Sequence, residues 1–199
     1  MKIEPGAAAG AFAEDGYTVV RNAASAEAMR VLMQYALSYL HVDGYFELEQ
    51  ETVSFARYAD ALGEVMLLDL LPVLEREAGF ALVPTYSFLR FYTPESRLEK
   101  HVDRPSCEIS ATLTVGYKTD KLWPIFVESG GKDIGVHLDV GDLMLYKGPE
   151  VPHWREPLEH GYWLQIFFHY VRADGKFVDE KFDRRDRVGP ILRPEAAAA

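Results

Sequence analysis

The chain of 199 residues contains one cysteine, Cys107, so it cannot form an intramolecular disulfide and carries no mark of a secreted disulfide scaffold. It also lacks a long uncharged stretch, because charged residues interrupt every apolar run before it reaches the length of a membrane-spanning helix. Basic residues are few: 21 Lys and Arg stand against 31 Asp and Glu, a formal net charge of −10. This excess of negative charge argues against a nucleic-acid partner.

The composition that remains is that of a folded protein, with 48% hydrophobic and 13% aromatic residues. No internal repeat or low-complexity linker divides the chain, so we expect a single domain over residues 1–199. The first residues, MKIEPGAAAG, contain no apolar core of signal-peptide length, and we therefore expect a cytoplasmic protein with no membrane contact. The sequence leaves the oligomeric state open.

Helical periodicity dominates the first part of the chain, about residues 25–80. Ser25 is a candidate N-cap, and it precedes apolar residues that share one helical face: Met29, Leu32, Met33, Ala36, Leu37 and Leu40. Residues 52–79 also have a helical pattern, in which Pro72 predicts two helices or a kink and Gly79 a C-cap. We expect these helices to pack against a sheet.

Short β-rich segments dominate the second part, about residues 84–172. Turn-forming pairs of Gly, Pro, Asp and Ser separate six predicted strands: 86–92, 107–116, 123–128, 133–138, 143–147 and 162–171. Residues 16–20 predict one more strand near the start of the chain. Helices followed by closely spaced strands indicate an α+β, mainly β fold, in which helices support an antiparallel sandwich or barrel.

The sequence His101-Val102-Asp103 and the distant His153 are the candidate metal ligands. Residues two apart on a strand point to the same side, so His101 and Asp103 can face one ion together. If the barrel returns His153 to that point, two imidazoles and one carboxylate cover one face of an octahedral ion. Three positions then stay open, which distinguishes a non-haem Fe(II) oxygenase site from a closed four-ligand zinc site.

Further residues have the spacing of a known enzyme family. Tyr92 precedes His101 by nine positions, the segment 139–148 contains a Gly-Asp turn leading towards His153, and residues 12–20 read as an opening strand. Together with the His-x-Asp pattern, this order resembles the Fe(II)/2-oxoglutarate-dependent dioxygenases, and among them the prolyl 4-hydroxylase-like branch. The resemblance extends over most of the chain.

The resemblance implies a double-stranded β-helix, which is a jelly-roll or cupin-like barrel, with N-terminal supporting helices. It implies Fe(II), 2-oxoglutarate and O2 as cofactors, with His101, Asp103 and His153 as metal ligands and no further catalytic side chain. In such enzymes 2-oxoglutarate is oxidised to succinate and CO2 while a second substrate is hydroxylated. We expect a small molecule, such as an amino acid or a related metabolite, as that substrate.

One position departs from the family pattern, because Trp163 occupies the place of the cation that binds the distal carboxylate of 2-oxoglutarate. Arg155 is our candidate for this role, since it lies two residues after His153 and its planar guanidinium suits a carboxylate. Tyr92 is expected to donate a hydrogen bond to the co-substrate. The alternative for Arg155 is an ion pair at the surface with Glu156 or Glu159.

Four other residues are candidates for ligand binding. Arg90 and Gln165 share the strand parity of Tyr92 and Trp163, so we assign them to the co-substrate. Arg104 and His169 are candidates for the substrate. Their alternatives are structural: Arg104 could pair with Glu108, and a buried His169 could be satisfied by a backbone carbonyl.

Two other functions fit parts of the pattern. A cupin-like iron enzyme that does not use 2-oxoglutarate would explain Trp163, and succinate formation distinguishes it from our first hypothesis. A non-enzymatic β-barrel binding protein would make the histidines incidental, and it would contain no stoichiometric metal.

Overall fold

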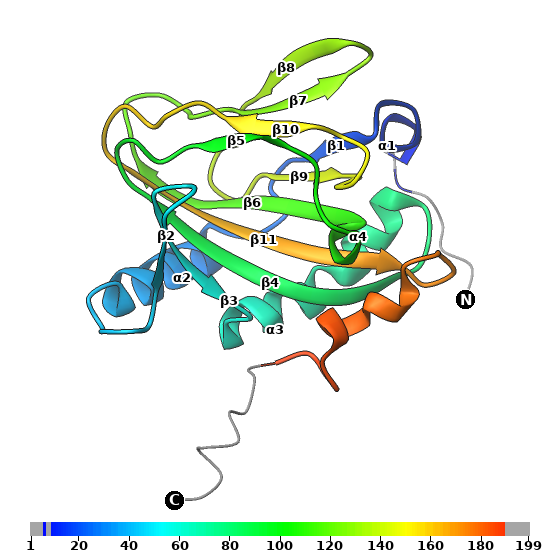
Figure 1. Ribbon diagram of the computed structural model, residues 1–199, viewed down its shortest axis with the longest axis horizontal. Helices are drawn as coiled ribbons and strands as arrows, with labels where there is room; N and C mark the ends of the chain where they lie inside the picture. The colour runs from blue at the N-terminus through cyan, green and yellow to red at the C-terminus, as the bar shows by residue number, and fades with distance from the viewer. Residues whose placement is uncertain (1–5, 7–8, 190–199) are drawn as a thin grey trace, which may run out of the picture.

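The computed structural model describes residue 6 and residues 9–189 (Figure 1). Most of the N-terminal segment on which the cytoplasmic expectation rests therefore lies outside the described residues. In chain order the elements are α1 (Ala9–Asp15), β1 (Tyr17–Val20), α2 (Ala26–Tyr39), β2 (Glu47–Glu49), β3 (Ser54–Tyr58), α3 (Ala61–Asp69), α4 (Leu71–Ala78), β4 (Leu82–Tyr92), β5 (Leu98–His101), η1 (Pro105–Cys107), β6 (Ile109–Lys118), β7 (Ile125–Ser129), β8 (Lys132–Val136), β9 (Leu143–Tyr146), β10 (His153–Arg155), β11 (Tyr162–Arg172) and η2 (Val178–Arg184).

The strands form two antiparallel sheets. The larger sheet has seven strands in the order β1-β9-β6-β11-β4-β3-β2, and the smaller has four in the order β5-β10-β7-β8. In Figure 1 the smaller sheet lies above the larger one, and the helices α2 and α3 lie below it. This arrangement is mainly β with supporting helices, as the sequence predicted, and the two sheets fit a double-stranded β-helix.

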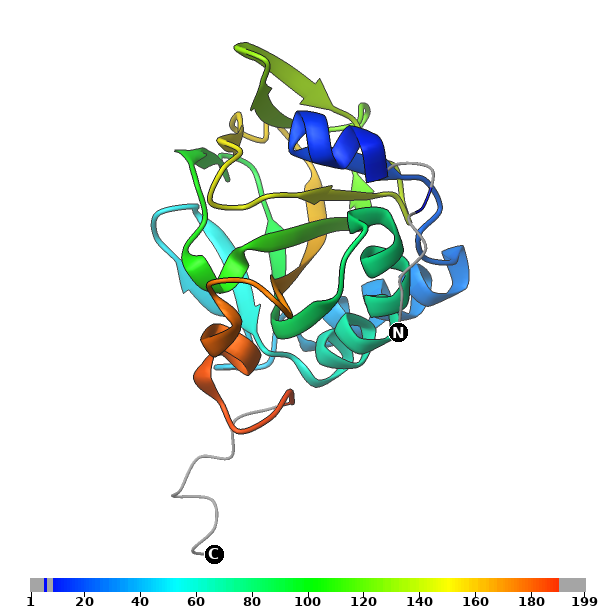
Figure 2. The same ribbon diagram turned by 90° about the vertical axis from the view of Figure 1, so that its right-hand side faces the viewer.

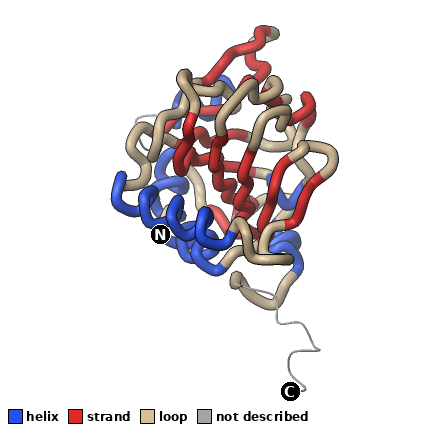
Figure 3. Tube along the Cα trace, turned by 90° about the vertical axis from the view of Figure 1, so that its left-hand side faces the viewer, coloured by secondary structure: helices blue, strands red, loops and turns tan. Residues whose placement is uncertain are grey.

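The larger sheet has one face against the helices and one face towards the smaller sheet. Leu89 of β4 and Ile166 of β11 belong to the main hydrophobic core, together with Leu32 of α2 and Leu67 of α3. Figure 3 shows several helices side by side at the lower left, next to the strands. Because side chains alternate along a strand, the neighbours of these core residues point to the opposite face, where the candidate site lies.

Helix α2 begins and packs as predicted. The Ser25 hydroxyl accepts a hydrogen bond from the Ala28 N–H at 3.2 Å, so it caps the first turn. Met29, Leu32 and Ala36 are buried against the sheet. Their spacing of three and four residues places them on one face of the helix, which explains why periodicity alone located it.

The prediction of helix from residue 52 onward is wrong for its first part, because Ser54–Tyr58 forms strand β3. This strand pairs with β4, and Val53 and Ala59 on either side of it have positive φ angles of 52° and 49°. Pairing with a long central strand provides backbone hydrogen bonds that outweigh a local helical pattern. The helix begins only at Asp60, whose carboxylate accepts from the N–H groups of Leu62 and Gly63.

The remainder of this segment follows the prediction of two helices. Helix α3 ends at Asp69, Pro72 lies in the first turn of α4, and Gly79 caps α4 with a φ of 84°. Proline is tolerated in a first turn because its missing N–H would have no helical partner there. Within the described ranges, no helix is long and apolar enough to cross a membrane.

Two short strands that the sequence did not predict hold the candidate histidines. His101 is the last residue of β5, and His153 is the first residue of β10. Cys107, predicted to begin a strand, instead lies in the short helix η1, and the strand begins at Ile109. Strands of three or four residues have too few side chains to show an alternating pattern, so only their pairing in the sheet reveals them.

The C-terminal segment η2 packs against β4 and η1, as Figure 2 shows at the lower left. Its Asp183 carboxylate accepts hydrogen bonds from the Tyr58 hydroxyl at 2.7 Å and from the Arg104 guanidinium at 3.0 Å. The alternative considered for Arg104, a pairing with Glu108, is therefore wrong. Glu108 instead accepts from the backbone N–H of Arg172 at 2.8 Å.

Candidate metal centre

The two histidines meet across the smaller sheet. Strands β5 and β10 are antiparallel neighbours, and their register places His101 directly opposite His153. The two imidazole centroids lie 4.3 Å apart. Residues about fifty positions apart are thus brought together by one pair of short strands.

A backbone carbonyl orients each imidazole. The Nδ1 atom of His101 lies 2.8 Å from the carbonyl oxygen of Glu99, and that of His153 lies 3.0 Å from the carbonyl oxygen of Val151. A carbonyl can only accept, so each Nδ1 carries the proton and each Nε2 has a free lone pair. A hydrogen bond from the ring nitrogen that does not bind the metal is the usual way in which a metal-binding histidine is held in the correct tautomer.

Both free Nε2 atoms face the same carboxylate oxygen. Asp103 follows β5, and its Oδ1 atom lies 3.6 Å from the Nε2 of His101 and 3.6 Å from the Nε2 of His153. These separations are too long for hydrogen bonds. Adjacent ligands of an octahedral ion bound at about 2.1 Å are about 3 Å apart, so the three atoms need only a small inward shift to bind one ion.

The other carboxylate oxygen of Asp103 is held by the protein. Its Oδ2 atom accepts a hydrogen bond from the Ser110 hydroxyl at 2.9 Å, while the Asp103 N–H donates to the carbonyl of Gly148 at 2.9 Å. Oδ1 is thereby left free for the two imidazoles. The donor set is two neutral nitrogens and one carboxylate oxygen, which fits the open facial site of non-haem Fe(II) enzymes.

The charges of the three groups agree with this arrangement. Burial works against ionisation of Asp103, but the nearby imidazoles and the Ser110 hydroxyl outweigh it and lower the pKa of this carboxyl to about 2. Burial lowers the pKa of His153, so that imidazole is neutral at pH 7. The neighbouring Asp103 raises the pKa of His101, which is the effect expected of a carboxylate beside a partly exposed imidazole.

Gly148 lies so close to Asp103 that no side chain fits there. A Cβ atom on Gly148 would lie 2.2 Å from the carbonyl oxygen of Cys107 and 2.6 Å from Oδ2 of Asp103. We expect Gly148→Ala to displace the carboxylate and to weaken Mn(II) binding about 10-fold or more, as measured by titration calorimetry. Gly10→Ala is the matched control, since a Cβ there meets nothing within 4 Å. Equal affinities for both variants would contradict the role of Gly148.

A second group of possible ligands, formed by Asp103, Cys107 and His169, is a poorer metal site. Ser110 lies between two of its members, because its hydroxyl oxygen is 2.9 Å from Asp103 and 2.9 Å from Nδ1 of His169. Burial raises the pKa of the Cys107 thiol to about 12, so the thiolate needed for metal binding is absent at neutral pH. Cys107 is buried, with 3% of its surface exposed.

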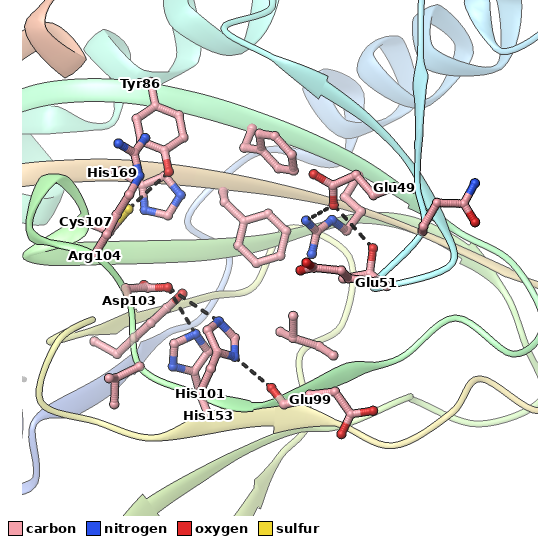
Figure 4. Close-up of a pocket in the computed structure, with 18 residues that line it drawn as sticks. Glu49, Glu51, Tyr86, Glu99, His101, Asp103, Arg104, Cys107, His153 and His169 are labelled. Atoms are coloured by element: carbon pink, nitrogen blue, oxygen red, sulfur yellow. Dashed lines mark hydrogen bonds and ion pairs between the residues drawn. The ribbon is translucent and has the colours of Figure 1, made fainter.

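A cavity of about 900 Å³ opens beside the three candidate ligands. Figure 4 shows Glu49 and Glu51 on one side of it and Tyr86, Arg104 and His169 on the other, with the two histidine ligands and Asp103 along its lower edge. Glu49 and Glu51 thus lie at one end of the cavity, where Arg90 pairs with Glu49, and Arg104 lies at the other end. This volume suits a small molecule.

Arg90, an expected co-substrate ligand, lines the cavity but is already paired. Its guanidinium donates to the Glu49 carboxylate and lies over the rings of Phe88 and Phe167, at 5.0 and 5.8 Å from their centroids. Arg104 also lines the cavity, stacked 4.9 Å over Tyr86. These arginines therefore help to form the wall and the mouth of the cavity.

Arg155 is buried, with 2% of its surface exposed, so the surface ion pair with Glu156 or Glu159 is wrong. Its Nη1 donates to the carbonyl of Trp123 at 2.6 Å, but its Nε and Nη2 have no hydrogen-bond partner in the described part of the chain. Burial lowers its pKa to about 10, so it remains cationic at neutral pH. An unpaired buried cation is costly unless a ligand provides the missing charge.

Tyr92, the expected hydrogen-bond donor to the co-substrate, is in the same situation. It is fully buried, and among the described residues its hydroxyl has no partner. Its ring packs edge-on against Trp123, which also lies 4.5 Å under the guanidinium of Arg155. Arg155 is not among the residues that line the cavity, whereas Tyr146 does line it, with its ring 4.6 Å from the imidazole of His153.

The other two expected binding residues have hydrogen bonds inside the barrel. Gln165 accepts from Trp163 Nε1 at 2.7 Å and donates to the Thr112 hydroxyl at 2.7 Å, so both its amide oxygen and its amide nitrogen have protein partners. His169 lines the cavity, and it bonds the Ser110 hydroxyl, not the backbone carbonyl of the alternative interpretation. Burial lowers the pKa of His169 to about 4, and its ring is neutral at pH 7.

Sequence reasoning missed Ser110, Gly148 and Tyr146 as parts of the site. Ser110 lies inside a continuous buried strand, and nothing in its local sequence distinguishes it from a packing residue. Gly148 was expected only as part of a turn. Their importance comes from what lies opposite them in the fold, which no local pattern records.

Comparison with known proteins gives a result only at the level of structure. No protein-family model matches the chain, and no curated protein matches it in sequence. A prolyl-4-hydroxylase from Pseudomonas putida matches with a TM-score of 0.69 and 17% identity, over 83% of this chain and 97% of the other. The alpha-ketoglutarate-dependent carbocyclase SnoK from nogalamycin biosynthesis matches with a TM-score of 0.71 and 14% identity, over 94% and 92%.

The chain has the fold of the 2-oxoglutarate/Fe(II) oxygenases. A further match is the epimerase SnoN, solved in complex with Fe3+, alpha-ketoglutarate and nogalamycin RO, with a TM-score of 0.67, 12% identity and coverage of 94% and 95%. Identities this low establish the oxygenase fold and leave the reaction to be argued from the site. The predicted fold class is confirmed.

Proposed function

We propose that the protein is a cytoplasmic Fe(II)- and 2-oxoglutarate-dependent oxygenase that acts on a small molecule. The observation that carries the proposal is the convergence of two free imidazole nitrogens on one carboxylate oxygen, with separations of 3.6 Å each. His101, Asp103 and His153 would hold the iron and leave three positions open for co-substrate and O2. When bound, the iron would supply the oxidising chemistry, and the protein would bind, orient and shield the reacting groups.

The unsatisfied groups behind the cavity support 2-oxoglutarate as the co-substrate. Within the described part of the chain, the Nε and Nη2 atoms of Arg155 have no partner, and neither does the nearby hydroxyl of Tyr92. A carboxylate satisfies both, forming charge-assisted hydrogen bonds in a site that excludes water. A co-substrate bound to the iron would extend from the cavity towards Arg155, which lies on β10 two residues beyond His153.

The open part of the cavity supports a small-molecule substrate. Phe88 and Phe167 provide apolar surface, and Arg90, Arg104 and His169 provide polar groups around it. The solved structures that match this fold include a hydroxylase, a carbocyclase and an epimerase, so the fold accommodates several reactions. We propose hydroxylation, because this reaction needs no protein side chain beyond the three metal ligands and the residues that bind the co-substrate and the substrate.

Anaerobic addition of Fe(II) and then 2-oxoglutarate to the metal-free protein tests the proposal. We expect a weak visible charge-transfer absorption that needs both additions, followed in air by release of succinate. Protein with Fe(II) alone is the control. Iron- and O2-dependent activity without succinate would favour the enzyme that does not use 2-oxoglutarate. Absence of metal binding would favour a non-enzymatic barrel.

A further inference from the structure

A buried hydrogen-bond chain connects the metal ligand Asp103 to the cavity. The Ser110 hydroxyl lies 2.9 Å from Oδ2 of Asp103 and 2.9 Å from Nδ1 of His169. Ser110 belongs to β6 and His169 to β11, and the register of these two strands places the residues opposite each other. The three side chains thus come from a loop and two central strands, so their contact depends on the whole barrel.

The chemistry of the groups sets the direction of these hydrogen bonds. An ionised carboxylate can only accept, so Ser110 must donate its single proton to Asp103. The carbonyl of Cys107 is a second possible acceptor, but it lies farther away, at 3.2 Å, and is uncharged. With its proton committed, Ser110 can only accept from His169, so Nδ1 of His169 carries the proton of the neutral ring.

This order makes the remaining nitrogen of His169 an acceptor. A neutral imidazole has one proton, and with that proton on Nδ1 the Nε2 atom has a lone pair. The ring is 6% exposed, lines the cavity and is held by Tyr86, whose centroid lies 4.5 Å away. Nε2 forms no hydrogen bond with any described residue, and a nearly buried acceptor is satisfied when a donor reaches it.

We propose that Ser110 and His169 are positioning residues that hold Asp103 as a one-oxygen metal ligand, and that Nε2 of His169 accepts a hydrogen bond from the substrate. The inference rests on the proposed function and names a substrate class: a small molecule with a hydroxyl or amine donor near the iron. A carbonyl or carboxylate at that point would meet a lone pair and be disfavoured. A substrate bound to His169 is thereby coupled to the metal ligand Asp103 through two hydrogen bonds, from His169 to Ser110 and from Ser110 to Asp103.

Metal affinity tests the positioning role without reference to activity. We expect Ser110→Ala to weaken Mn(II) binding about 10-fold by titration calorimetry, because Oδ2 loses its donor and the carboxylate can rotate. We expect His169→Phe, which keeps the ring packing against Tyr86, to weaken it about threefold. Ser87→Ala is the matched control, since Ser87 is also buried in the larger sheet but its hydroxyl has no partner among the described residues.

The outcomes separate the two proposals. Wild-type protein that does not bind Mn(II) would overturn the proposed function and this inference together. Wild-type binding with equal affinity in Ser110→Ala and His169→Phe would overturn the inference alone. If Ser110→Ala does not fold, as judged by circular dichroism, the affinity of His169→Phe decides between these outcomes.

The tautomer of His169 is a direct second measurement. Two-bond ¹H–¹⁵N correlations of histidine-labelled protein loaded with diamagnetic Zn(II) distinguish the two ring nitrogens, and loss of a signal set in His169→Phe assigns it. We expect a protonated Nδ1 and an unprotonated Nε2. A proton on Nε2 would overturn the assignment of a donor-bearing substrate, because the cavity would then present a donor.

Discussion

Replacing Asp103 with alanine is expected to abolish iron binding. Its Oδ1 atom is the one oxygen that both imidazoles face, at 3.6 Å from each Nε2, so its loss leaves two neutral ligands and no negative charge. Loss of a hydrogen bond beside a metal ligand already costs about 10- to 100-fold in affinity. Loss of the ligand itself should exceed about 100-fold, as measured by Mn(II) titration and by the iron retained after anaerobic loading.

The matched control is Asp133→Ala, which removes an exposed carboxylate of β8 that pairs with Lys100 at the surface. Exposed pairs contribute little to stability, so this variant should bind metal and fold as the wild type does. Retention of iron-dependent succinate formation in Asp103→Ala would contradict the proposed ligand set. The Ser110 hydroxyl and the loop of Gly148 would then hold a carboxylate that has only a structural role.

Replacing Arg155 with methionine is expected to separate co-substrate binding from stability. Removing one partner of a buried, hydrogen-bonded charge pair costs about 2–5 kcal/mol, so the dissociation constant for 2-oxoglutarate should rise by at least about 30-fold. The Nε and Nη2 atoms of the same guanidinium have no hydrogen-bond partner among the residues that the structure describes. Because an apolar side chain removes this uncompensated buried charge, the melting temperature should be equal to or higher than that of the wild type.

Anaerobic titration of 2-oxoglutarate into Mn(II)-loaded protein provides the measurement. Binding can be followed by tryptophan fluorescence, since Trp123 and Trp163 lie 4.5 and 5.6 Å from the guanidinium of Arg155. Arg90→Met is the comparison, because Arg90 is the other candidate cation and is already neutralised by Glu49. A larger loss of 2-oxoglutarate affinity in Arg90→Met than in Arg155→Met would contradict the assignment of Arg155. It would indicate that the co-substrate binds beside Arg90 at the cavity wall.

Some features of the protein follow from local sequence. The hydroxyl of Ser25 and the spacing of Met29, Leu32 and Ala36 determine where α2 begins and which face it buries, because capping and periodicity act within a few residues. Gly79 ends α4 for the same reason, with a positive φ that glycine adopts without strain. The spacing of His101 and Asp103 likewise indicated a metal ligand pair.

Other features depend on contacts between distant segments. Ser54–Tyr58 has a helical pattern, yet it is a strand because β4 is available to pair with it. His101 and His153 lie on strands too short to show periodicity, and only the pairing of β5 with β10 places them opposite each other. Local preference differs by about 1 kcal/mol or less per residue between helix and strand, so tertiary hydrogen bonding and burial decide such cases.

The sequence by itself determined the chemical types at the site: two imidazoles, a carboxylate and an arginine two residues beyond the second imidazole. Only the tertiary structure decided their roles. Burial left two guanidinium nitrogens of Arg155 without a hydrogen-bond partner among the described residues, and the pairing of β6 with β11 placed Ser110 between His169 and Asp103. Both effects arise from the exclusion of water and from long-range register, which are properties of the folded barrel and of no segment within it.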